Sequence, residues 1–288
     1  MKNKPIFKFG VLALSIVLIA CSGGSTDAGC PEIDGREINV VATTPMIGEF
    51  VSQVGGENIN LTILMPPEAD PHTYEPSPQD AGKIADADLV FYTGLMYEPA
   101  TLIELLENSA CGAEALAEVG ESVFPIEFKE GGHDDHDDHD EEGHDDHDEE
   151  GHDDHDGHEG HGHGAYDPHF WFDPNRVVYA AEFIESKLVE FDSSNAANYE
   201  ADGDAYTNEL SGLTGQVSQL IGSIPSQNRK LITTHESLGY LEAKFGLEVL
   251  STIIPDLDSS NEITPSQLVG VIDVIEDNNV KVIFIEAE

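Results

Sequence analysis

The stretch EINVVATTPMIGEFVSQVGGENINLTILMPP, residues 37–67, alternates between two kinds of apolar pattern. Its first eight residues are rich in β-branched side chains and predict a strand. The next twelve predict a helix, because Pro45 suits the first helical turn and Gly55 and Gly56 suit the end. NINLTILM then predicts a second strand, which a pair of prolines ends. A strand, a helix and a strand in succession predict a parallel sheet covered by helices.

The same alternation continues on both sides of a low-complexity insert. Further helices are predicted over residues 77–87, 99–110, 173–191, 195–224, 236–246 and 264–279. Further strands are predicted over residues 88–94, 122–128, 229–235, 247–254 and 280–288. We therefore expect an α/β protein with two lobes, each a mostly parallel sheet covered by helices. One long helix joins the lobes, and ligands of such proteins usually bind in the cleft between them.

These patterns divide the chain into five parts. We expect a signal peptide at 1–20, a linker at 21–36, an N-terminal α/β lobe at 37–194 with a disordered loop at 131–164, a connecting helix at 195–224 and a C-terminal α/β lobe at 225–288. The second lobe has only three predicted strands and ends on a strand, so we expect it to be truncated.

The first residues predict export. Three lysines precede the apolar run FGVLALSIVLIA, which is short for a membrane span. The run leads into LIAC, residues 18–21, a pattern that resembles a bacterial lipoprotein signal with lipid attached to Cys21. The alternative is an uncleaved anchor helix. Either case predicts a protein held at the outer face of the cytoplasmic membrane or in the periplasm.

The net charge narrows the classes of possible partner. The formal net charge is −45, of which the insert contributes −16 and the rest of the chain −29. Such a field repels nucleic acid and anionic membrane surfaces, so we predict no nucleic-acid partner.

The chain has three cysteines, and Cys21 is assigned to lipid attachment. Cys30 and Cys111 are the other two, and an exported location permits a disulfide between them.

The insert is built only from Gly, His, Asp and Glu, which cannot form a packed core. Each histidine is flanked by carboxylates or glycines, so that the segment offers weak, exchangeable sites for divalent ions. We expect an auxiliary metal-binding loop that gathers zinc, although a solvated charge run is the alternative. Its histidines are His133, His136, His139, His144, His147, His152, His155, His158, His161 and His163.

Only three histidines lie outside the insert: His72, His169 and His235. His72 and His235 each follow a predicted strand, and His169 follows the insert. Ligands of open α/β sheets collect outside the carboxyl ends of the strands, so we expect the three imidazoles to converge in the cleft. Three imidazoles make a tetrahedral zinc site with one further position. Second-shell acceptors are expected among nearby carboxylates: Asp70, Glu75, Asp167, Asp173 and Glu236.

The segments around these histidines, DPHTYEPSPQD, DPHFWFDPN and THESLGYLEAKFGLE, resemble the ligand-bearing segments of the zinc/manganese-binding solute receptors of bacterial ABC transporters. The lipoprotein signal, the His-rich insert and the long helix are also similar to that family. The resemblance covers residues 37–288 and implies that the three histidines are the metal ligands. It also implies a monomeric binding protein that delivers Zn²⁺ to a permease with a separate ATPase subunit.

The resemblance also bears on the metal. Manganese-preferring members usually carry a carboxylate at the third position, so His235 favours zinc, with Mn²⁺ as the alternative. The family's fourth ligand, a downstream carboxylate, would lie beyond Glu288, and water is the other candidate. A metal-binding adhesin or a zinc buffer is also compatible with the sequence. A zinc hydrolase is less favoured, because HExxH and GxSxG motifs are missing from the sequence.

Overall fold

The computed structural model describes Cys30, Ile33 and residues 35–128, 166–254 and 263–285. Its first sheet is entirely parallel, with the strand order β2–β1–β3–β4. The strands are β1 (Ile38–Ala42), β2 (Ile59–Ile63), β3 (Leu89–Tyr92) and β4 (Leu116–Glu118). The opening strand–helix–strand unit thus pairs β1 directly with β2, as residues 37–67 predict.

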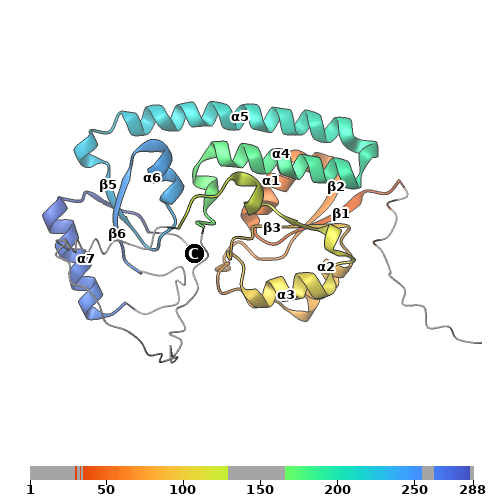
Figure 1. The fold of residues 1–288 in the computed structure, drawn as a ribbon, viewed down its shortest axis with the longest axis horizontal. Coiled ribbons are helices and arrows are strands. Elements are labelled where there is room, and N and C mark those ends of the chain that lie inside the picture. Colours follow the sequence, from red (N-terminus) through yellow and green to blue (C-terminus); the bar gives the residue numbers. More distant parts are fainter. Residues whose placement is uncertain (1–29, 31–32, 34, 129–165, 255–262, 286–288) are drawn as a thin grey trace, which may run out of the picture.

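Helices cover both faces of this sheet (Figure 1). One apolar cluster joins the sheet to α1 (Pro45–Gly55), α4 (Pro174–Phe191) and α5 (Ala196–Gly222). A second cluster, on the other face, involves α2 (Pro78–Ala85) and α3 (Ala100–Ser109). Successive residues of a strand point to opposite faces, so Val40 joins the first cluster and Val41 the second.

The predicted strand at 122–128 is wrong. The fourth strand is β4, six residues earlier, where Ala117 is buried and Leu116 pairs with Val90 of β3. Residues Gly120–Val123 form a 3₁₀ turn, and Phe124 has a positive φ of 53°. A left-handed residue followed by a proline cannot continue a strand ladder, because proline also lacks a backbone donor.

The second sheet is also parallel, with the order β6–β5–β7. Its strands are β5 (Lys230–Thr233), β6 (Glu248–Thr252) and β7 (Val282–Ile283), and its helices are α6 (Gly239–Phe245) and α7 (Pro265–Asn278). The predicted order of elements is confirmed, although β7 pairs over only two residues. The two-lobed α/β fold class is therefore confirmed, whereas the exact domain boundaries stay a prediction.

The long helix α5 runs over both sheets (Figure 1). Its first half packs on α1 and α4, where Tyr199 and Leu210 are buried. The Tyr199 hydroxyl donates to Asp192 Oδ2 at 2.9 Å, which fixes α5 to the end of α4. Its last turns lead to β5. Among the described residues, none of the helices combines the length and apolar character needed to cross a membrane.

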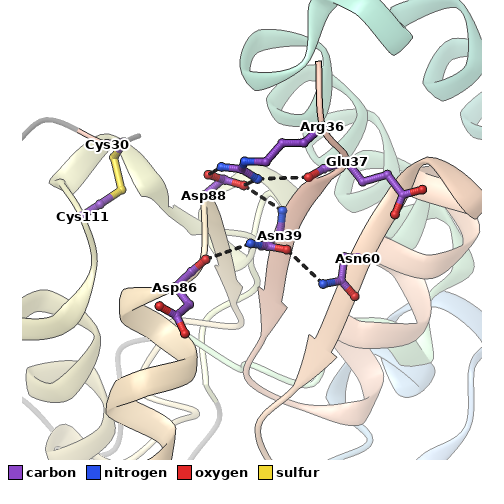
Figure 2. A network of polar contacts seen from close by, with 8 residues as sticks. All are labelled: Cys30, Arg36, Glu37, Asn39, Asn60, Asp86, Asp88 and Cys111. Atoms are coloured by element: carbon purple, nitrogen blue, oxygen red, sulfur yellow. Dashed lines mark hydrogen bonds and ion pairs between the residues drawn. A yellow bond between two sulfur atoms is a disulfide. The ribbon is translucent and has the colours of Figure 1, made fainter. Parts of the chain in front are cut away.

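The amino-terminal part of the described chain is attached to the first sheet at two points (Figure 2). A disulfide joins Cys30 to Cys111, just after α3. The Arg36 guanidinium forms a two-pronged ion pair with the buried Asp88 carboxylate, which also accepts the backbone N–H of Asn39. Cys21 and the insert histidines lie outside the described residues.

Candidate metal centre

His72 lies in the loop that follows β2. The Asp70 carboxylate accepts the backbone N–H of His72 at 2.9 Å and the Thr73 hydroxyl at 3.1 Å. This turn is typical of an aspartate that hydrogen-bonds to the backbone two residues ahead. It fixes the direction in which the loop leaves the carboxyl end of the sheet.

His169 lies between the insert and α4, and its side chain is only 3% exposed. Asp167 repeats the arrangement at Asp70, because its Oδ1 accepts the backbone N–H of His169 at 2.8 Å. The same oxygen lies 2.9 Å from His169 Nδ1. Asp173 begins α4 as its N-cap by accepting the N–H of Asn175. The DPH and DP sequences therefore build two consecutive turns that aim the imidazole inward.

His235 follows β5 of the second sheet, two residues after the strand ends at Thr233. Its Nε2 lies 3.4 Å from Nε2 of His169. The two residues belong to different lobes, so this contact joins the two lobes.

The three histidines meet at one point. One ligand nitrogen from each of His72, His169 and His235 lies within 4.8 Å of the other two. The ring centroids are 5.3 Å apart for His169 and His235, 5.6 Å for His72 and His169, and 5.9 Å for His72 and His235. Two ligands of a tetrahedral zinc ion lie roughly 3.3–3.4 Å apart, given Zn–N distances of about 2.0–2.1 Å. The His169–His235 pair has this separation.

The environment keeps His72 uncharged. Burial lowers the pKa of its imidazole from 6.5 to about 4, and the charges of His169 and His235 contribute in the same direction. The Asp70 carboxylate and a hydrogen bond with the backbone of Tyr97 oppose this shift without cancelling it. Neutral imidazole is the form that binds a metal ion, so His72 is ready to bind at neutral pH.

Two aromatic rings enclose the imidazoles on one side. The Tyr97 ring meets His72 edge-on at a centroid distance of 4.7 Å and His169 at 5.6 Å. Trp171 lies 5.6 Å from His169 and 5.2 Å from Tyr97. Aromatic rings therefore pack directly against two of the three imidazoles, those of His72 and His169.

Sequence reasoning missed the loop that presents Tyr97. Gly94, Leu95 and Met96 all have positive φ angles, between 54° and 75°. The buried Glu98 carboxylate holds this turn by accepting the N–H groups of Thr93 and Gly94. Burial raises the pKa of Glu98, although these hydrogen bonds act against that rise. The position of TGLMYE after a strand was the available signal, since ligands collect at the carboxyl ends of parallel strands.

The five carboxylates expected to hold the histidine rings take different roles. Asp70 and Asp167 contact the histidine segments as described. Asp173 caps α4 and lies 3.9 Å from Lys244 Nζ, and Glu75 is exposed. Asp167 contacts an imidazole nitrogen directly, with its Oδ1 2.9 Å from His169 Nδ1.

Residues 40–288 match the ZnuA family, described as "Zinc-uptake complex component A periplasmic". The chain belongs to this family. Curated relatives include the manganese-binding lipoprotein MntA of Halalkalibacterium halodurans, which is 26% identical over 99% of this chain and 81% of its own length. The manganese ABC transporter substrate-binding lipoprotein PsaA of Streptococcus anginosus is 28% identical over 96% of this chain and 80% of its own length.

Solved structures share the fold of this ZnuA family member. The periplasmic zinc-binding protein TroA from Treponema pallidum superposes with a TM-score of 0.69 at 22% identity, covering 88% of this chain and 79% of TroA. A crystal structure of ZnuA gives a TM-score of 0.68 at 24% identity, with coverage of 87% and 82%. Family membership makes the chain a metal-binding, substrate-binding protein of an ABC transporter. The role of each histidine as a ligand is a proposal.

Proposed function

We propose that this protein captures a divalent transition-metal ion outside the cytoplasm at His72, His169 and His235 and delivers it to an ABC transporter permease. One observation carries the proposal. Three imidazoles from segments 66 residues or more apart place their nitrogens within 4.8 Å of one another. In a chain with three histidines outside the insert, such a meeting has no other evident structural use.

Zn²⁺ is the metal that we propose. Imidazole is a good ligand for zinc, whereas the harder manganese ion prefers carboxylate and carbonyl oxygens. The 3.4 Å separation of the His169 and His235 nitrogens also suits a tetrahedral ion. The half-buried His72 supports the same choice, because its lowered pKa keeps the imidazole neutral, and neutral imidazole is a good ligand for zinc.

Mn²⁺ is the second candidate, and the relatives favour it. Both MntA of Halalkalibacterium halodurans and PsaA of Streptococcus anginosus are named for manganese. In addition, Glu236 follows His235 directly and could supply a carboxylate oxygen if the loop turned.

A competition experiment distinguishes the two metals. The mature protein is loaded with Zn²⁺, dialysed against Mn²⁺ at equal and at hundred-fold higher concentration, and its metal content is measured. Zinc retention under both conditions supports the proposal, whereas displacement at equal concentration shows a manganese receptor. A His235→Asp variant is the matched control, because a carboxylate at this position is expected to weaken zinc retention relative to manganese.

Delivery requires partners. Both relatives are named as lipoproteins, and PsaA is named as the substrate-binding lipoprotein of an ABC transporter. We therefore propose a permease and its ATPase as partners and lipid attachment at Cys21 as the tether. Deletion of the gene is expected to abolish growth at scarce zinc, and the wild-type chain restores it. Restoration by a chain that lacks all three histidines would contradict the proposed role.

A further inference from the structure

Asp167 is the meeting point of three segments. Its backbone N–H donates to the Ile126 carbonyl at 2.9 Å, which joins the two chain ends that flank the insert. Its carboxylate holds His169 through the backbone N–H and Nδ1. Its backbone carbonyl accepts the Tyr240 hydroxyl at 2.8 Å. The position of Asp167 therefore depends on a residue from the second lobe.

Tyr240 belongs to α6 but lies inside the first lobe. Its side chain is 2% exposed and is part of the apolar cluster between the first sheet and helices α1, α4 and α5. Its hydroxyl also accepts the backbone N–H of Ile126 at 3.2 Å. One oxygen atom thus contacts both chain ends at the base of the insert. The Arg176 guanidinium lies 5.9 Å from the Tyr240 ring centroid and closes the other side.

Gly239, the residue before Tyr240, also contacts Asp167. A Cβ atom at this position would lie 2.5 Å from Asp167 Oδ2, so any larger residue would force the carboxylate to shift. This glycine does not have a positive φ, and close approach is the requirement that it meets.

These contacts connect two of the proposed ligands. Tyr240 lies five residues after His235 on the same segment, and Asp167 lies two residues before His169. We propose that the Tyr240 hydroxyl, with Gly239 beside it, is a positioning group that sets His169 Nε2 of the first lobe against His235 Nε2 of the second. The inference rests on the proposed function, because it concerns the same histidine site.

The effect of Tyr240 on metal binding follows from how the ligand imidazoles are oriented. A metal-binding imidazole keeps its position through the group that holds its other nitrogen, which here is Asp167. If the Tyr240 hydroxyl is lost, the Asp167 carbonyl and the Ile126 N–H lose a buried partner and the turn relaxes. The carboxylate then holds His169 less firmly. The Tyr240 hydroxyl bonds to Ile126 and Asp167, so its effect on the metal passes through Asp167.

The test compares two tyrosine-to-phenylalanine variants, each of which removes one buried hydroxyl group. Tyr240→Phe removes the hydroxyl at the lobe junction, whereas Tyr199→Phe removes a buried hydroxyl that donates to Asp192, away from the site. Zn²⁺ affinity is measured on the mature chain with a competing chelator that leaves the weak sites of the insert unloaded. The absorption spectrum of one equivalent of Co²⁺ reports the coordination geometry, and urea unfolding reports stability.

Tyr240→Phe is expected to weaken zinc binding about ten-fold, at the lower end of the range for outer-shell partners, and to change the Co²⁺ spectrum. Tyr199→Phe is expected to lower the urea midpoint while leaving affinity and spectrum unchanged. Equal destabilisation by both variants with unchanged zinc affinity and Co²⁺ spectrum would overturn the inference and leave the proposed function intact. Failure of the wild-type chain to bind zinc tightly would overturn the proposed function, and the inference with it.

A second pair of variants covers the case in which Tyr240→Phe does not fold. Gly239→Ala pushes on Asp167 Oδ2 without removing a hydrogen bond, and Gly215→Ala, in the open middle of α5, is its control. We expect a several-fold loss of zinc affinity and a changed Co²⁺ spectrum for Gly239→Ala alone. Unchanged binding by Gly239→Ala would count against Asp167 as the link between the lobes.

Discussion

Asp167 Oδ1 holds His169 at two atoms, the backbone nitrogen at 2.8 Å and Nδ1 at 2.9 Å. An ionised carboxylate can only accept hydrogen bonds, so Nδ1 carries the proton and Nε2 keeps its lone pair. That lone pair faces Nε2 of His235 at 3.4 Å. Asp167 thus sets the tautomer and the direction of the His169 imidazole before any metal arrives.

Loss of the Asp167 carboxylate should weaken zinc binding at the three histidines. Asp167→Ala is expected to lower zinc affinity by about 10–100-fold, because the imidazole loses the partner that orients it and raises its basicity. Asp167→Asn should lose less, since the amide oxygen can still accept. Isothermal titration with zinc measures both. Asp86→Ala, which removes an exposed carboxylate from the end of α2, is the control. Equal affinities for all three variants would show that Asp167 does not orient a ligand.

The low pKa of His72 predicts a pH effect on stability. The imidazole takes up a proton near pH 6.5 in the unfolded chain but near pH 4 in the folded one. The unfolded state therefore binds more protons between these values, so stability is lost as pH falls from about 6.5 to 4. Side-chain NMR of the metal-free protein should give His72 an apparent pKa of about 4. A value near 6.5 would contradict an uncharged, half-buried His72, and His72→Asn should make the stability profile flatter.

The predictions from sequence succeeded where a pattern is local. Apolar runs located β1, β2 and β3. Of the three histidines outside the insert, His72 and His235 were found from their places after strands and His169 from its place after the insert. The strand Leu116–Glu118 was missed because it is only three residues long and owes its pairing to the free edge of β3.

Contacts between distant segments were beyond this reasoning. Five nearby carboxylates looked equivalent, and only the folded chain shows Asp167 at an imidazole nitrogen. The Tyr97 contact with His72 depends on a left-handed turn that Glu98 holds, and only one of the three residues with a positive φ is a glycine. The interaction of Tyr240 with Asp167 spans 73 residues and crosses from one lobe to the other.

The insert should affect loading rather than affinity. We expect a chain without residues 132–163 to keep its tight zinc site but to take up zinc more slowly when the metal is scarce, because its weak sites gather ions close to His169. Stopped-flow loading and growth under chelation measure this. A variant with every insert histidine changed to glutamine keeps the length and is the control for loop removal. Uptake at the wild-type rate in both variants would leave the insert without this role.

The disulfide should matter for stability alone. Cys30 and Cys111 are separated by 81 residues, and closing a loop of this size stabilises a protein by about 4 kcal/mol. The double variant Cys30→Ser, Cys111→Ser is therefore expected to unfold at a lower urea concentration with unchanged zinc affinity. A loss of affinity would mean that the link shapes the metal site as well.

The central claim is that three imidazoles share one ion. X-ray absorption at the zinc edge tests it most directly, with the chain lacking residues 132–163 so that the insert contributes no histidine. We predict three imidazole nitrogens at about 2.0–2.1 Å, and loss of this signal when His72, His169 and His235 are changed to alanine together. A zinc ion bound by fewer than three imidazoles, or the same spectrum from the triple variant, would contradict the account.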